Sequence, residues 1–186
     1  MRAMMIAALA AAGFAASADA ALKSGATAAD FTTRGALAGK VFTLNLKEQL
    51  KKGPVVLYFF PAAFTPGCSA EARAFAEHIG DFKAAGASVI GMSADPVDKL
   101  ADFSTKDCAN KFPVASAGPR VISDYDVALT YTGRDGKAAT ITNRTSYVIA
   151  PDGHIIFSLT DPAAGPHVQN TLDTVRAYAK AHPTHS

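Results

Sequence analysis

The chain has 186 residues, of which 49% are hydrophobic, and a formal net charge of +2. This length predicts a single domain that can bury one core without help from a metal ion or a disulfide. Because the charge is near balance and no run of Lys or Arg stands out, we expect neither nucleic acid nor a membrane surface as a partner.

The first 20 residues, MRAMMIAALAAAGFAASADA, have the layout of a secretory signal peptide. One positive residue, Arg2, precedes the uncharged, Ala-rich residues 3–17, and a small-x-small cleavage pattern ends at Ala20. The apolar part is short for a membrane span, and an uncleaved anchor or a disordered leader is the alternative. We expect cleavage after Ala20, one domain over residues 21–186, and a periplasmic or secreted protein without stable membrane association. Such an oxidising compartment allows two cysteines to pair.

The first half of the mature chain alternates between strand-like and helix-like segments. Residues 40–46, KVFTLNL, alternate as a strand does, and a short helical turn follows them. Residues 55–60, VVLYFF, are continuously apolar and rich in β-forming residues, which predicts a central strand covered on both faces. Apolar residues then recur at helical spacing over residues 68–85, and Gly86 is expected to end that helix.

The second half continues this alternation. Residues 87–93 predict another buried strand, and Asp95 and Pro96 form a cap-like pair before a second helix. Residues 146–159 are two apolar runs joined by Pro-Asp-Gly, which predicts a hairpin, and residues 167–182 predict a closing helix. This order is typical of an α/β, thioredoxin-like fold in which helices flank a mixed central sheet.

One segment and two histidines receive less specific predictions. Residues 130–143 show no clear element. His154 in the hairpin turn and His167 at the start of the last helix are expected at the surface.

One of the two cysteines, Cys68, stands where an apolar strand gives way to a helix. Thr65 followed by Pro66 fits an N-cap with proline in the first helical position, which places Cys68 in the first turn. Unpaired backbone N–H groups and the positive end of the helix dipole would face the sulfur there and favour thiolate over thiol. The alternative is that Cys68 is a small apolar filler, although Gly67 leaves the turn unshielded in a way that a filler would not need.

The segment PAAFTPGC, residues 61–68, resembles the active-site signature Pro-x-x-x-Thr/Ser-x-x-Cys of the peroxiredoxins. Arg144, in NRTSYVIAPDGHI, resembles the family's segment of Arg, a small polar residue, an aromatic residue and an apolar strand. The resemblance extends from about Ala28 to the C-terminus. Because no long C-terminal extension bears a cysteine, the closest branch is the bacterioferritin comigratory or Q-type group.

This resemblance implies a thiol peroxidase that reduces hydrogen peroxide or organic hydroperoxides without a cofactor. The Cys68 thiolate would attack a peroxide oxygen and become a sulfenic acid. Arg144 would hold the thiolate and donate hydrogen bonds to the peroxide, and the Thr65 hydroxyl would both accept and donate. Pro61 would shield the thiolate, and the backbone N–H groups of Gly67 and Cys68 would bind the oxygens.

Cys108, in KDCANKF near the end of the second predicted helix, has three interpretations. By the resemblance it is the resolving cysteine, forming a disulfide that a thioredoxin-like or other thiol reductant reduces. Some relatives resolve instead from the fifth residue after the peroxidatic cysteine, where this chain has Arg73. The alternatives are a free thiol and a permanent disulfide, which could add roughly 4 kcal/mol. We prefer the resolving role because a permanent bridge would consume the thiolate.

The remaining motifs exclude several other classes of site. No His, Cys and Asp residues have metal-ligand spacing, and neither a C-x-x-C motif nor a glycine-rich phosphate loop is present. Glu71 is equally compatible with capping, with solvation and with a contact to Arg144.

A non-catalytic thioredoxin-fold peroxide sensor or client-binding module is the alternative function. Such a module would not require the peroxide-activating groups at Pro61, Thr65 and Arg144. The sequence leaves open whether the protein forms a homodimer.

Overall fold

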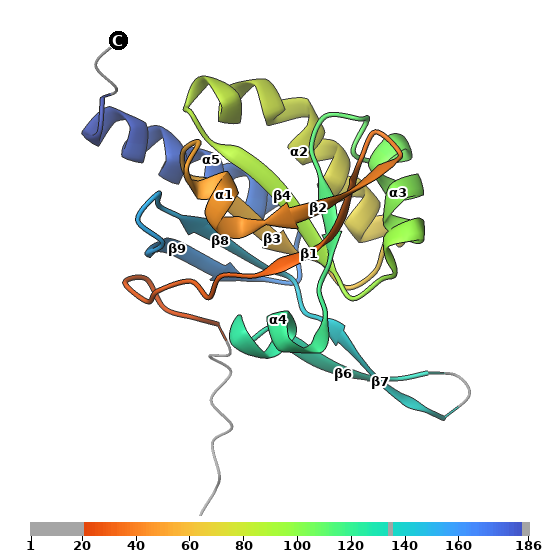
Figure 1. Cartoon of the computed structure of the whole chain (residues 1–186). Helices are drawn as coiled ribbons and strands as arrows, with labels where there is room; N and C mark the ends of the chain where they lie inside the picture. Colours follow the sequence, from red (N-terminus) through yellow and green to blue (C-terminus); the bar gives the residue numbers. More distant parts are fainter. Residues whose placement is uncertain (1–20, 134–135, 184–186) are drawn as a thin grey trace, which may run out of the picture.

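The computed structural model describes residues 21–133 and 136–183 (Figure 1). The predicted signal peptide, residues 1–20, lies outside the described residues. Within the described ranges no helix is both long enough and apolar enough to span a bilayer.

A mixed sheet forms the centre of the fold, as predicted, and it has seven strands (Figure 1). Strand β3 (Val55–Phe59) pairs in parallel with β4 (Ser88–Ser93) on one side and antiparallel with β8 (Thr145–Ile149) on the other. In spatial order the strands are β2 (Lys40–Asn45), β1 (Thr32–Leu37), β5 (Val114–Ser116), β4 (Ser88–Ser93), β3 (Val55–Phe59), β8 (Thr145–Ile149) and β9 (Ile155–Thr160).

Strand β3 contributes to two cores because successive side chains of a strand point to opposite faces. Val56 and Tyr58 belong to one buried cluster, and Leu57 and Phe59 belong to the other. Every residue of β3 is buried, which confirms the predicted central strand.

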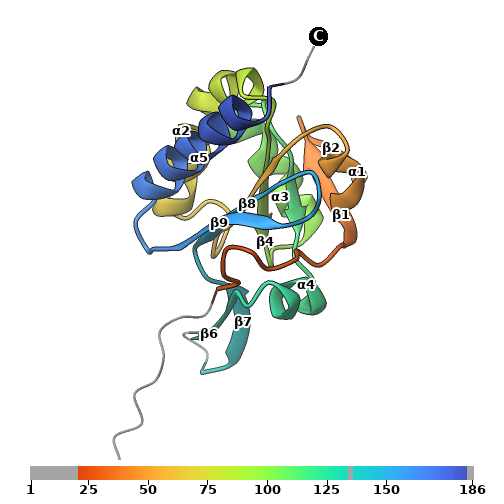
Figure 2. The ribbon, with the colours of Figure 1, turned by 90° about the vertical axis from the view of Figure 1, so that its left-hand side faces the viewer.

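Helices cover both faces of the sheet. Residues of α2 (Pro66–Ala84), α3 (Val97–Lys106) and α5 (Gly165–Ala181) pack in the cluster that contains Tyr58. Helices α2 and α5 lie side by side on this face (Figure 2). Residues of α1 (Leu46–Leu50) and α4 (Pro119–Asp124) pack in the cluster that contains Leu57. As predicted, α2 ends before Gly86, whose φ of 72° suits a residue without a side chain.

The structure adds a hairpin in the segment where the sequence shows no clear element. Strands β6 (Ala128–Thr132) and β7 (Ala138–Thr142) pair antiparallel as a separate two-stranded sheet. The hairpin projects from the body beside α4 (Figure 1). All five residues of β6 are exposed, so the segment lacks the alternation of buried and exposed positions that predicts a strand.

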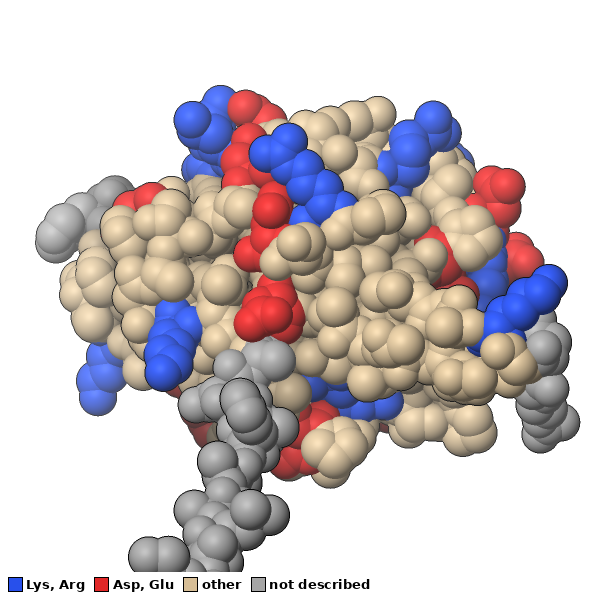
Figure 3. All heavy atoms as spheres, turned by 90° about the horizontal axis from the view of Figure 1, so that it is seen from below, with Lys and Arg blue, Asp and Glu red and all other residues tan. Residues whose placement is uncertain are grey.

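On the face seen in Figure 3, positive and negative side chains are interspersed among uncharged ones.

Gly91 of β4 lies opposite Tyr58 in the β3–β4 register. A Cβ atom at Gly91 would lie 2.9 Å from Cζ and Oη of Tyr58 and from a methyl carbon of Val114. The absence of a side chain at this position therefore makes room for the Tyr58 ring.

We predict that Gly91→Ala lowers the free energy of unfolding by about 1–3 kcal/mol, because the added methyl overpacks the core. Gly80→Ala is the matched control, since Gly80 lies in α2 with no atom within 4 Å of an added Cβ. The control is expected to raise the free energy of unfolding by about 0.5–1 kcal/mol. Urea denaturation measures both, and a Gly91→Ala variant as stable as wild type would contradict the tight contact.

Candidate active site

Cys68 lies in the first turn of α2, where the sequence predicts it. The helix begins at Pro66, and the N-cap residue Thr65 has the extended backbone (φ −77°, ψ 146°) expected there. Cys68 is the third helical residue and is only 2% exposed. Its sulfur therefore sits near the positive end of the helix dipole in a largely dry environment.

The loop that leads into α2 is held by a carboxylate from the next strand connection. The backbone N–H of Ala63 donates to Asp95 Oδ2 at 2.6 Å. Asp95 also accepts hydrogen bonds from Ser93 Oγ at 3.0 Å and Lys99 Nζ at 2.7 Å. The prediction that Asp95 helps to cap the following helix is wrong, because Pro96 is the N-cap of α3. Asp95 binds a backbone group 32 residues earlier instead, a partner that local pattern does not reveal.

Thr65 occupies the N-cap position without capping the helix through its side chain. Its hydroxyl donates to the carbonyl of Ala62 at 3.0 Å. In the described part of the chain, no acceptor pairs with the backbone N–H of Gly67 or Cys68. These donors, together with the lone pairs of the Thr65 oxygen, are available to a ligand beside the sulfur.

Arg144, just before β8, reaches the cysteine from the neighbouring strand. Its Nη2 lies 3.5 Å from Cys68 Sγ, and its Nη1 pairs with Glu71 Oε2. Its Nε donates to the carbonyl of Pro162 at 3.1 Å. The side chain is 9% exposed, so three partners, two from α2 and one from the loop before α5, orient one largely buried guanidinium.

Glu71 is the partner of Arg144, which decides among the roles that the sequence left open. Its carboxylate is fully buried, and Oε1 has no hydrogen-bond partner within the described structure. Burial raises the pKa of Glu71 to about 8, although the charge and hydrogen bond of Arg144 oppose this shift. Glu71 can therefore hold a proton near neutral pH.

Tyr58 of β3 is a neighbour of the site. Its sequence context predicts only a buried strand residue. Burial raises its pKa well above the ordinary value, and negative charge at Cys108, Glu71 and Cys68 raises it further. Its hydroxyl is buried and has no hydrogen-bond partner within the described ranges. Tyr58 thus lies within electrostatic reach of both cysteines.

Cys108 lies two residues beyond the end of α3 and is fully buried. Both cysteines are free thiols and belong to one buried cluster. Burial, followed by the charge of Asp107, raises the pKa of Cys108 and favours its thiol form. Asp107 accepts hydrogen bonds from Ser69 Oγ at 3.1 Å and Arg73 Nη2 at 2.6 Å. These contacts fasten the Cys108 segment to the start of α2.

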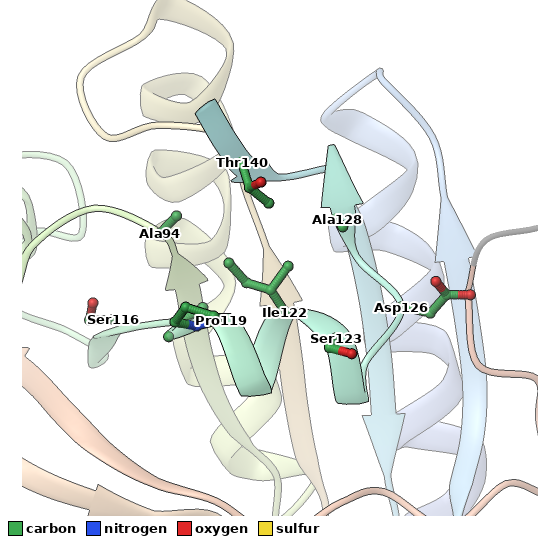
Figure 4. Close-up of a pocket in the computed structure, with 10 residues that line it drawn as sticks. Ala94, Ser116, Pro119, Ile122, Ser123, Asp126, Ala128 and Thr140 are labelled. Atoms are coloured by element: carbon green, nitrogen blue, oxygen red, sulfur yellow. The ribbon is translucent and has the colours of Figure 1, made fainter. Parts of the chain in front are cut away.

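Two hollows differ in their relation to this site. One of about 260 Å³ adjoins Arg144 and has mostly apolar walls, made by Pro61, Leu129, Asn143, Thr160 and Pro162. The other, of about 620 Å³, lies where α4 meets the β6–β7 hairpin (Figure 4). Its walls include Ile122, Ala128 and Thr140 but neither Cys68 nor Arg144. In the described part of the chain, no three His, Cys, Asp or Glu side chains gather as a metal site would require.

Residues 24–158 match the AhpC/TSA family. The chain belongs to this family. It is similar to peroxidoxin BcpB from Mycobacterium tuberculosis, with 34% identity and a TM-score of 0.73 over 84% of this chain and 97% of that one. Peroxiredoxin Q from Xanthomonas campestris is 26% identical, with a TM-score of 0.67 over 78% of this chain and 90% of that one.

A third relative, peroxiredoxin Bcp of Escherichia coli strain K12, is 29% identical over 67% of this chain and 80% of its own length. These relatives place the peroxiredoxin in the bacterioferritin comigratory or Q-type group, as its motifs indicate. Its enzyme class is therefore that of the thiol peroxidases.

The raised pKa of Glu71 makes the stability of this peroxiredoxin depend on pH. Between the ordinary value of 4.5 and the folded value of about 8, the folded state binds more protons than the unfolded state. The free energy of unfolding should then fall as pH rises through this window, by up to about 1.4 kcal/mol per pH unit.

We predict that Glu71→Gln removes this contribution, so that the variant gains stability relative to wild type between pH 5 and pH 8. Urea denaturation at several pH values measures the difference. Glu77→Gln, at an exposed position of the same helix, controls for the change from carboxylate to amide. A wild-type to Glu71→Gln difference that stays constant with pH would show that Glu71 titrates normally.

Proposed function

We propose that Cys68 is the peroxidatic cysteine of an enzyme that reduces hydrogen peroxide and organic hydroperoxides. The observation that carries this proposal is the 3.5 Å contact between Arg144 Nη2 and Cys68 Sγ at the start of a helix. A neighbouring positive charge and the N-terminal end of a helix are the surroundings in which nucleophilic cysteines are typically found.

In the proposed reaction the Cys68 thiolate attacks one peroxide oxygen and breaks the O–O bond. Cys68 becomes a sulfenic acid, and the other oxygen takes up a proton and leaves as water or an alcohol. The guanidinium of Arg144 and the backbone N–H groups of Gly67 and Cys68 stabilise the charge that develops on the oxygens. The Thr65 oxygen, whose proton is donated to Ala62, accepts a hydrogen bond from the peroxide.

The hollow beside Arg144 supports organic hydroperoxides as substrates alongside hydrogen peroxide. Pro61, Pro162 and Leu129 give it apolar walls next to the guanidinium. Leu129, on the β6–β7 hairpin, is 43% exposed and can cover an alkyl group while the peroxide faces Arg144. Burial of apolar surface contributes about 25 cal/mol per Å², so an alkyl substituent gains affinity there.

We predict that Cys68→Ser lowers the steady-state rate of peroxide consumption with a thiol reductant by at least about 10³-fold, because the nucleophile is lost. Arg144→Lys keeps the charge but lacks the planar fork, and should give an intermediate activity. Peroxide consumption by Cys68→Ser at the wild-type rate would refute the assignment. Wild-type protein that is oxidised once and does not turn over would favour the peroxide sensor instead.

We also propose that Cys108 resolves the sulfenic acid. Its sulfur would attack Cys68, forming a disulfide and releasing water, and a thioredoxin-like or other thiol protein would reduce the disulfide. Attack requires the Cys108 thiolate, whereas burial favours the thiol. The segment after α3 must therefore open, which breaks the contacts of Asp107 with Ser69 and Arg73.

We predict that Cys108→Ser abolishes the intramolecular disulfide that forms after one equivalent of peroxide, while the first oxidation of Cys68 persists. Mass spectrometry of alkylated, proteolysed protein detects the bridge. The same bridge in wild-type protein before peroxide is added would identify a permanent structural disulfide.

Export belongs to this proposal as well. Residues 1–20 would direct the chain out of the cytoplasm, so that the mature enzyme meets peroxide in the periplasm or outside the cell. Its reductant would then be a thiol protein of that compartment.

A further inference from the structure

His167 is a buried residue next to the active site, and the prediction that it lies at the surface is wrong. It stands in the first turn of α5 and is 0% exposed. The loop between β9 and α5 contacts the imidazole ring. This contact buries a residue whose place at the start of a helix predicts exposure to solvent.

Both ring nitrogens of His167 have a defined partner. Nε2 lies 2.8 Å from the carbonyl oxygen of Asp161, which can only accept, so Nε2 carries the hydrogen. Nδ1 lies 2.8 Å from Ser146 Oγ and accepts from that hydroxyl. Burial lowers the pKa of His167, and although the hydrogen bond to the Asp161 backbone opposes this shift, the positive charge of Arg144 adds to it, so the ring is neutral near neutral pH.

The backbone that His167 holds is the backbone that orients Arg144. The carbonyl of Asp161 accepts from His167, and the next carbonyl, that of Pro162, accepts from Arg144 Nε at 3.1 Å. The N–H of Asp161 in turn donates to the Arg144 carbonyl at 3.3 Å. The Asp161–Pro162 segment is thus fixed by His167 on one side and bonded to Arg144 on the other.

We propose that His167 is a positioning residue for peroxide reduction: it fixes the Pro162 carbonyl, which orients the Arg144 guanidinium toward Cys68. This inference rests on the proposed role of Arg144. The contact between Glu71 and Nη1 would, on its own, leave the guanidinium free to rotate about that contact. The second contact, at Nε, fixes the plane of the group, and Nη2 then points at the sulfur. Small errors in such an orientation cost rate because the peroxide must be held in line.

Two variants of His167 separate positioning from mere packing. In His167→Gln the side-chain nitrogen can occupy the position of Nε2, so the donor to Asp161 is kept. In His167→Asn the nitrogen can occupy the position of Nδ1, so only the contact with Ser146 is kept. We expect kcat/KM for peroxide within threefold of wild type in the Gln variant and about tenfold lower in the Asn variant, the loss that one hydrogen bond accounts for.

A double-mutant cycle tests whether His167 acts through Arg144. In an Arg144→Gln background, His167→Asn should change kcat/KM by less than twofold, because no guanidinium remains to be oriented. His154→Gln, an exposed histidine in the β8–β9 turn, is the control and should match wild type in both backgrounds. Thermal unfolding of every variant shows whether the comparison involves folded proteins.

Several outcomes would overturn the inference. These are equal losses in the Gln and Asn variants, a wild-type rate in the Asn variant, or an equal loss from His167→Asn with and without Arg144. If His167→Asn does not fold, the Gln variant still decides, since a tenfold loss in that variant refutes the role of Nε2. Wild-type activity in Arg144→Gln would refute the proposed role of Arg144 itself, and this result is distinct from a failure confined to His167.

Discussion

The site depends on a single guanidinium that is held away from water. Burying a guanidinium requires partners for its N–H groups, since an unpaired buried charge is costly. Cys68, Glu71 and the Pro162 carbonyl supply these partners. The first two come from the start of α2 and the third from the loop before α5, and the central sheet brings these parts to one end of β3 and β8.

The arrangement links the fold directly to the chemistry. Strand β3 delivers the loop that begins α2, and β8 starts beside it directly after Arg144, because Phe59 and Thr145 are register partners at the end of the β3–β8 ladder. Asp95, which follows the neighbouring strand β4, then fixes this loop by accepting a hydrogen bond from the backbone N–H of Ala63. A displacement of any of these strands would separate the Cys68 sulfur from the Arg144 guanidinium. The geometry of the site therefore depends on correct packing of the sheet.

Local patterns in the sequence predicted the parts of the structure that depend on neighbouring residues. The buried strand β3, the start of α2 at Pro66 and the β8–β9 hairpin follow from apolar runs, capping and turn residues. Asp95 and His167 were assigned wrongly, since their partners lie in other segments of the chain. The β6–β7 hairpin was missed because its first strand is exposed throughout.

The carboxylate of Asp107 has a consequence for the lifetime of the oxidised enzyme. It ties the segment that carries the second thiol to Ser69 and Arg73, so in the proposed cycle closure of the disulfide would have to wait for those contacts to release. During that delay another peroxide molecule can convert the sulfenic acid to a sulfinic acid, a form that common thiol reductants do not restore. The strength of the ion pair between Asp107 and Arg73 would thereby set the oxidant concentration that inactivates the protein.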